Sequence, residues 1–226
     1  TVWGGSPHNN TNPKAKDALP RIRQLIFEGK NKEAQELCGP TICSQSANGM
    51  PYQTVGSLHL DFDGINEYND YYRDLDIEKA IATTRFTANG VTYTREAYTS
   101  FPDQVLVIRL TASQKKSISF TAKYSTPYKS SVIRCISPRK ELQLNGKAND
   151  HEGIEGKVEF TALTRIENNG GKLEILSDST LQVKDANSVI LYVSIGTNFV
   201  NYKDVSGDAL NSAQQYLKLV NKNYPK

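Results

Sequence analysis

From Tyr52 onward, hydrophobic and polar residues alternate along most of the chain, which is the pattern of β-strands with one buried face. The clearest example is AIATTRFTANGVTYTREAYTSF, in which Asn89-Gly90 is the preferred pair for a two-residue type I′ hairpin turn. The turn sets a register that pairs Phe86 with Tyr93, Thr87 with Thr92, and Arg85 with Thr94. On the polar face this register puts Arg85 diagonal to Glu96, and we expect a cross-strand ion pair between them.

Further segments with strand character follow this hairpin: QVLVIRLTAS, SISFTAKYS, KELQLNG, GKVEFTALTRIE, KLEILS, TLQVK and SVILYVSIGT. Asn145-Gly146 and Asn169-Gly170-Gly171 are expected to be turns between them. About ten strands without alternating helices favour antiparallel sheets that pack face to face. We therefore predict a mainly β fold, a large antiparallel super-β-sandwich over residues 52–200.

Near the N-terminus the pattern changes to a helical period, and we predict a short helical excursion over residues 12–38. Asn12-Pro13 has the residue types of an N-cap and a first helical position. Pro20 is expected to restart the helix, and three apolar residues after it share one face: Ile22, Leu25 and Ile26. Gly29 ends this helix, and NKEAQELC forms another. These helices are expected to dock on something larger.

The last stretch of the chain is also predicted to be helical, over residues 206–222. Ser206 is the expected N-cap, and apolar residues follow on one face: Leu210, Ala213, Leu217 and Val220. With no internal repeat and no low-complexity linker, residues 1–226 are predicted to form a single domain.

Composition narrows the class of protein. The net charge of +3 is small and Lys alternates with Asp and Glu, so nucleic acid is not an expected partner. No apolar run approaches the roughly 18 residues that a membrane span needs. The cysteines are odd in number, and of them Cys38 and Cys43 can form a disulfide in an oxidising compartment. Neither a CxxC motif nor a nearby pair of histidines indicates a metal, and we expect no cofactor.

Two acidic positions invite a catalytic interpretation. Asp61 and Asp63 point the same way along a strand, as a general acid and base would, but they also suit a strand that ends at Gly64. His151-Glu152 has the residue types of a base or a ligand, and equally those of a residue pair that stabilises a Gly-rich loop. The motifs GxSxG, GxGxxG and the P-loop are absent.

Aromatic residues offer a different chemistry. Tyr68, Tyr71 and Tyr72 in EYNDYYRD can form a surface on which a carbohydrate stacks. Tyrosine is also a common strand residue, so the same cluster is compatible with a purely structural role.

Three long stretches, in order and spacing, resemble a known family: TVWGGSPHNNTNPKAKDALPRIRQLIFEGKNKEAQEL, MPYQTVGSLHLDF and TNFVNYKDVSGD. They are similar to the N-terminal β-sandwich domain of glycoside hydrolase family 95, the α-L-fucosidases. The segment DYYRDLDIEKAIATTRFTANGVTYTREAYTSFPDQVLVIRL resembles the central strands of that domain. The resemblance covers nearly the whole chain.

The resemblance implies a parent enzyme with an N-terminal sandwich, a helical linker, an (α/α)6 barrel and a C-terminal β-domain. The parent would hydrolyse terminal α-L-fucosyl linkages with inversion, using a Glu, Asn side chains and an Asp that all lie in the barrel. No position of this chain matches that catalytic motif, so we expect an inactive domain that packs against the barrel. The parent is expected to be periplasmic or extracellular.

The family's domain begins with a few dozen residues before the segment that resembles TVWGG, so its first strands are expected to lie outside this chain. Their absence would leave a sheet edge open to an edge-to-edge dimer. Residues expected at the substrate rim or domain interface come from the irregular family segments: Trp3, Tyr52, Gln53, Asn198, Asn201 and Tyr202. The alternative for Trp3 and Tyr52 is that they fill the end of the sandwich.

Three hypotheses follow for function. The first is a non-catalytic N-terminal domain of an α-L-fucosidase-like glycoside hydrolase. The second is a stand-alone carbohydrate-binding module that binds fucosylated glycans through its Tyr face. The third is a sugar-processing enzyme in which Asp61 and Asp63 are the working pair. The sequence leaves open whether the parent prefers α-L-fucose or α-L-galactose.

Overall fold

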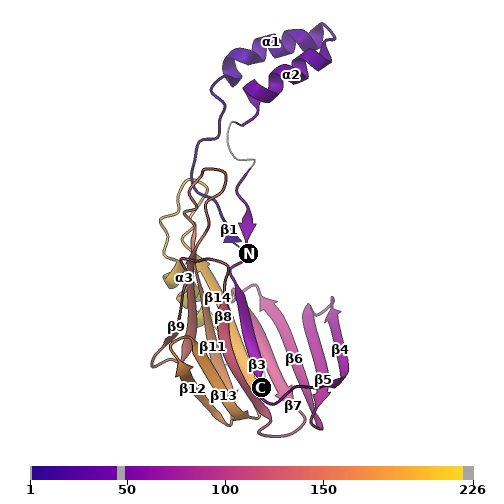
Figure 1. Cartoon of the computed structure of the whole chain (residues 1–226), viewed down its shortest axis with the longest axis vertical. Coiled ribbons are helices and arrows are strands. Elements are labelled where there is room, and N and C mark those ends of the chain that lie inside the picture. The colour runs from indigo at the N-terminus through magenta and orange to yellow at the C-terminus, as the bar shows by residue number, and fades with distance from the viewer. Residues whose placement is uncertain (1, 45–48, 221–226) are drawn as a thin grey trace.

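Two antiparallel sheets face each other in the computed structural model, which describes residues 2–44 and 49–220 (Figure 1). In spatial order, the eight-stranded sheet consists of Asn69–Asp76 (β4), Ile81–Ala88 (β5), Val91–Ser100 (β6), Val105–Ala112 (β7), Ser188–Thr197 (β14), Glu159–Asn169 (β11), Glu141–Lys147 (β10) and Val132–Ile136 (β9). The four-stranded sheet consists of Lys172–Ser177 (β12), Thr180–Ala186 (β13), Ile118–Ser125 (β8) and Ser57–Phe62 (β3). The predicted mainly β fold, a large antiparallel sandwich with helices near both ends, is confirmed.

The main core lies between the two sheets. Its most deeply buried members alternate along the strands that face one another: Ile118 and Phe120 on β8, Leu181 and Val183 on β13, Leu142 and Leu144 on β10, Phe160 on β11, and Leu191 on β14. Because successive side chains of a strand point to opposite faces, this alternation buries one face of each strand between the sheets.

A helix covers part of the outer face of the eight-stranded sheet. Ala209–Leu219 (α3) lies over β14 and β11, and its Ala213 and Leu217 share a core cluster with Leu163 of β11 and Tyr192 of β14. The N-cap is Asp208, two residues after the predicted cap, because its carboxylate accepts the N–H of Asn211 at 2.9 Å. The prediction of Ser206 as the N-cap was therefore wrong.

The β5–β6 hairpin has the predicted turn and register. Asn89 and Gly90 have φ values of 50° and 74°, as a type I′ turn requires, and the three predicted strand pairs are present. The predicted ion pair between Arg85 and Glu96 was wrong. Glu96 lies opposite Arg109 of the neighbouring strand β7 and pairs with it at 3.3 Å, while Arg85 lies over the ring of Tyr72.

Of the two predicted glycine turns, one is a turn. Gly170 and Gly171 have positive φ and connect β11 of one sheet to β12 of the other. Asn145-Gly146 instead lies within β10, so the predicted turn there was wrong. Gly146 is opposite Phe160, and a Cβ at this position would lie 2.3 Å from the ring Cζ, so the glycine makes room for the aromatic ring.

The N-terminal excursion is a helical hairpin of Ala15–Phe27 (α1) and Asn31–Ile42 (α2). Pro20 lies inside α1, so the predicted restart there was wrong. Burial of Ile22 and Leu25 against Ala34 favours one continuous helix despite the hydrogen bond that proline cannot donate. The third residue of the predicted apolar face, Ile26, is exposed.

The helical hairpin stands away from the two sheets, connected to them by two segments of chain (Figure 1). The Asn12 side chain connects the two ends of this helical hairpin. The Asn12 amide donates to the carbonyl oxygens of Pro40 and Cys43, and the Asn12 Oδ1 accepts the N–H of Lys14. Within the described part of the chain, no helix is long and apolar enough to cross a membrane.

Candidate functional site

Three of the six sequence-predicted rim residues line a single hollow at one end of the sandwich. Val2–Trp3 (β1) pairs with Tyr52–Gln53 (β2), which places Trp3 opposite Tyr52. The hollow has a volume of about 390 Å³ and is lined by Val2, Trp3, Tyr52, Val158, Thr197, Phe199 and Tyr202. Tyr52 and Tyr202 are 77% and 70% exposed, so their rings are free to contact a partner.

The Trp3 indole is held in place on two sides. Its ring meets Phe199 edge to face, with 5.7 Å between ring centroids. On the other side is Gly5, where a Cβ would lie 1.9 Å from the indole ring, so only glycine fits. The Gly4 N–H donates to the Pro51 carbonyl at 2.7 Å and anchors the same segment to the chain before β2.

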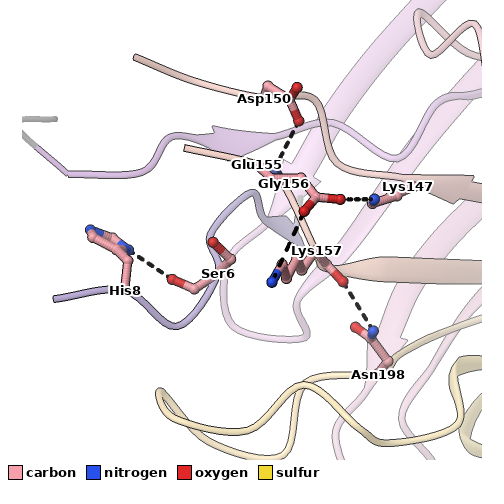
Figure 2. Close-up of polar contacts among 8 residues, drawn as sticks. All are labelled: Ser6, His8, Lys147, Asp150, Glu155, Gly156, Lys157 and Asn198. Atoms are coloured by element: carbon pink, nitrogen blue, oxygen red, sulfur yellow. Dashed lines mark hydrogen bonds and ion pairs between the residues drawn. The ribbon is translucent and has the colours of Figure 1, made fainter. Parts of the chain in front are cut away.

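The remaining three predicted residues hold loops instead of lining the hollow. Asn198 is 7% exposed, and its amide donates to the Lys157 carbonyl at 3.1 Å (Figure 2). Its Oδ1 accepts the Glu159 N–H at 2.9 Å. The Gln53 Oε1 accepts the N–H of Asn149, and the Asn201 Oδ1 accepts that of Lys203. Their side-chain bonds fix the backbone that positions the aromatic residues.

Beside the hollow, the loop over residues 148–158 carries a chain of charged contacts (Figure 2). Glu155 bonds to Lys147 at 2.8 Å and lies 4.0 Å from Lys157. The hydrogen bond from Lys147 and the two positive charges lower the pKa of Glu155, and the same bond raises the pKa of Lys147. A carboxylate held ionised in this way is unsuited to donate a proton, so this cluster orders the loop.

Sequence reasoning missed the other four residues that line this hollow: Val2, Val158, Thr197 and Phe199. Phe199 is adjacent to Asn198 in the segment TNFVNY, and only the fold brings it against Trp3, nearly two hundred positions away. The sequence feature that could have identified Phe199 is a large apolar residue in the loop directly after a predicted strand.

The two aspartates considered for acid–base chemistry do not form a pair. Asp61 bonds to Lys123 at 2.8 Å, and this bond and the lysine charge lower the pKa of Asp61. Asp63 lies beyond the end of β3, and its backbone N–H donates to the Ser119 carbonyl. The strand-end interpretation therefore fits both residues better than a catalytic one.

The histidines and cysteines are dispersed. Both backbone polar groups of His151 bond to Ile154, which closes a turn, and His59 contacts the Ser125 hydroxyl. Cys38, Cys43 and Cys135 are free thiols. Among residues 2–44 and 49–220, no three His, Cys, Asp or Glu side chains gather as metal ligands would.

The predicted Tyr surface borders a second, larger hollow on the inner face of β4, β5 and β6. It has a volume of about 570 Å³, and its aromatic wall includes Tyr68, Tyr71 and Phe86. Tyr68 lies 5.7 Å from Tyr71 and 5.9 Å from Phe86 between ring centroids. Tyr72, the third residue of the predicted cluster, pairs with Arg85 outside this hollow.

Comparison with known proteins gives consistent matches. Residues 1–202 match the family described as glycosyl hydrolase family 65, N-terminal domain. Alpha-L-fucosidase 2 of Arabidopsis thaliana is 30% identical over 225 residues, which cover 88% of this chain and 26% of the plant protein. Probable alpha-fucosidase A of Aspergillus niger is 24% identical over 208 residues, 88% of this chain and 25% of the fungal protein. The chain thus spans about a quarter of the length of these curated relatives.

Proposed function

The chain belongs to the family of glycosyl hydrolase family 65 N-terminal domains, and from this we propose that it is the non-catalytic N-terminal domain of an α-L-fucosidase-like glycoside hydrolase. The sequence resemblance to an α-L-fucosidase N-terminal domain agrees with the names of the relatives, although the matched family carries the number 65 and not 95. The observation that carries the proposal is that fucosidases about four times as long match this chain over 88% of its residues.

In this proposal the parent enzyme hydrolyses terminal α-L-fucosyl linkages, and the chemistry takes place in a barrel outside residues 1–226. The aromatic hollow around Trp3, Tyr52 and Tyr202 forms part of the domain interface or the substrate rim. The exposed apolar side chains of the helical hairpin, of which Phe27 is 84% exposed, form another part of that interface. The parent acts in the periplasm or outside the cell.

The first experiment compares the 226-residue chain with the longer polypeptide that contains it, using a nitrophenyl α-L-fucoside as substrate. We expect nitrophenol release by the longer polypeptide and none by the 226-residue chain. Turnover by the 226-residue chain would overturn its assignment as non-catalytic. A parallel assay with the α-L-galactoside decides which sugar the parent prefers.

A second experiment tests the aromatic hollow in the longer polypeptide. Tyr52→Ala and Tyr202→Ala should raise KM or lower the thermal stability of the assembled enzyme, because each removes an exposed ring from the interface. Tyr72→Ala is the matched control, since Tyr72 is exposed on β4 away from this end. Equal effects of all three substitutions would exclude the hollow from the interface.

One observation favours the second candidate, a stand-alone carbohydrate-binding module. The rings of Tyr68, Tyr71 and Phe86 line one concave surface, as sugar-stacking rings do. Calorimetric titration of the 226-residue chain with fucosylated oligosaccharides tests this candidate. Heat of binding that is lost in Tyr71→Ala would support it, and a flat trace would leave the first proposal alone.

A further inference from the structure

The aromatic hollow around Trp3 and the larger hollow beside Tyr68 differ in charge. Among the described residues, none of the seven that line the aromatic hollow carries a charge, and most of them are aromatic or aliphatic. The larger hollow contains Arg73 and Arg95, and the Nε–H of Arg95 is buried without a hydrogen-bond partner in the described part of the chain. A charged ligand would lose its hydration in the aromatic hollow without gaining a counterion. A ligand that fits there is therefore neutral and has an apolar surface.

The walls of the aromatic hollow are already in place before a ligand binds. The Trp3 indole lies between the Phe199 ring, which it meets edge to face, and Gly5, where a Cβ would overlap it. Asn198, directly before Phe199, is buried, and its amide bonds to the backbone of Lys157 (Figure 2). Rings that are fixed in this way lose little conformational freedom when a ligand stacks on them, which favours binding.

Polar groups surround the opening of the aromatic hollow. The rings of Tyr52 and Tyr202 are largely exposed, and neither hydroxyl has a hydrogen-bond partner among residues 2–44 and 49–220. The Lys203 ammonium lies 5.2 Å from the centroid of the Tyr202 ring and adds a donor beside it. Apolar walls with a few polar groups at the edge are typical of small-molecule sites. A hexopyranose matches them, because C–H bonds cluster on its faces and hydroxyls surround its ring.

We propose that the aromatic hollow binds a neutral hexopyranose of the glycan from which the parent enzyme removes fucose. The inference rests on the proposed function, in which the substrate is a glycan and the chemistry takes place outside residues 1–226. The terminal fucose then lies at the catalytic centre, and the sugars that follow it are the ones available to this domain. The hollow of about 390 Å³ is near the lower end of the range of about 300–1,000 Å³ for ligand pockets, which suits one or two sugar rings.

The competing occupant is an apolar side chain of a neighbouring domain. Such a side chain would cover the rings of Tyr52 and Tyr202 and exclude water from their hydroxyls, and a buried hydroxyl without a partner is costly. A bound sugar offers hydroxyls of its own and leaves the edge of the hollow hydrated. The unpaired tyrosine hydroxyls therefore favour the sugar.

Trp3 is the only tryptophan of the chain, so its fluorescence reports directly on the aromatic hollow. The 226-residue chain is titrated with lactose and, separately, with maltose, which are neutral hexose disaccharides. We expect a saturable change in Trp3 emission with both sugars, because stacking tolerates differences in hydroxyl stereochemistry, and an affinity in the millimolar range. The absence of a saturable change with either sugar would overturn the proposal.

Variants locate the sugar on the domain. Tyr52→Ala and Tyr202→Ala should each weaken binding roughly threefold to tenfold, because each removes one aromatic contact. Tyr72→Ala, exposed on β4, and Tyr71→Ala, in the larger hollow, should leave the affinity unchanged. Binding that is lost in Tyr71→Ala and retained in Tyr202→Ala would place the sugar in the larger hollow and overturn the proposal.

Kinetics of the longer polypeptide separate a bound sugar from a packed domain. Tyr202→Ala should raise KM for a fucosylated oligosaccharide roughly threefold to tenfold and leave KM for α-L-fucosyl fluoride unchanged, because the fluoride leaving group is a single atom. An equal rise with both substrates would show that the ring packs against a neighbouring domain, which contradicts the proposal. Inactivity of the unaltered longer polypeptide on the fluoride would instead contradict the proposed function, and the Trp3 titration would still decide whether the hollow binds sugar.

Discussion

The two halves of the eight-stranded sheet have similar alternating sequences and very different burial. On β14 and β11, inward-facing Leu191 and Phe160 are at most 1% exposed, and α3 covers part of the opposite face. On β5, inward-facing Phe86 is only partly buried, because no strand of the other sheet lies opposite it among the described residues. The alternation thus determines which face a residue occupies, and the neighbouring layer determines how much free energy its burial contributes.

The largest expected difference between the halves is the cost of removing a phenylalanine ring. Phe160→Ala should lower the free energy of unfolding by about 3–5 kcal/mol, because the ring is enclosed by Tyr128 and the residues around it. Phe86→Ala, in the half of the sheet that no strand of the other sheet covers, should lower the free energy of unfolding clearly less than Phe160→Ala does. Urea denaturation of both variants gives the comparison, with exposed Phe101→Ala as the neutral control. Equal costs would mean that the two halves are equally buried.

A smaller effect is expected from filling the space that Gly146 leaves for Phe160. Gly146→Ala should destabilise the protein by about 1–3 kcal/mol, since its Cβ would overlap the ring and both strands lie in the covered half. The matched control is Gly39→Ala, because a Cβ at this position in α2 would have no atom within 4 Å. Gly64 is unsuitable as a control, since its positive φ would strain an alanine. We therefore expect Gly39→Ala to be neutral or stabilising, and a loss as large as that of Gly146→Ala would contradict the steric explanation.

The core between the two sheets, where Tyr124 of β8 meets Thr164 of β11, should also respond to high pH. Burial raises the pKa of Tyr124 to about 12, and its hydroxyl lies 2.6 Å from that of Thr164. The unfolded chain releases this proton near pH 10, so stability should fall by up to about 1.4 kcal/mol per pH unit between roughly pH 10 and 12. Tyr124→Phe should be less stable at neutral pH but lose less over this range. Denaturation at several pH values measures both slopes, and parallel slopes would show that Tyr124 is not responsible.

The smallest effect is expected at the surface of the β3 strand. Asp61→Asn removes the ion pair with Lys123, in which both side chains are about half exposed, and should change the free energy of unfolding only slightly because water screens the pair. Added salt should reduce the difference between wild type and variant. A loss of stability as large as that of Gly146→Ala would show that Asp61 has a partner beyond Lys123.

Sequence patterns predicted the local structure well where one strand and one turn decide it. Asn89-Gly90 specifies a turn by its own backbone preference, and the register of the β5–β6 hairpin follows from it. Asn145-Gly146 has the same residue types, but Phe160 on the adjacent strand decides its conformation. That contact joins distant segments, so no local pattern contains it.

The candidate site was also predicted only in part from the sequence. The family segments led to Trp3, Tyr52 and Tyr202, which the fold gathers in one hollow. Asn198 lies in the same loop as Tyr202, yet its side-chain amide bonds to the backbone of Lys157 and Glu159. Whether a polar residue faces a ligand or its own backbone depends on the path of the loop, which composition does not encode.

The bonds of Asn12 have a consequence for the evolution and engineering of this protein. Because the Asn12 side chain bonds to the backbone of Pro40 and Cys43, the first and last residues of the helical hairpin are held next to each other. We therefore expect that changes in the length or sequence of the helical hairpin leave the register of the strands in the sandwich unchanged.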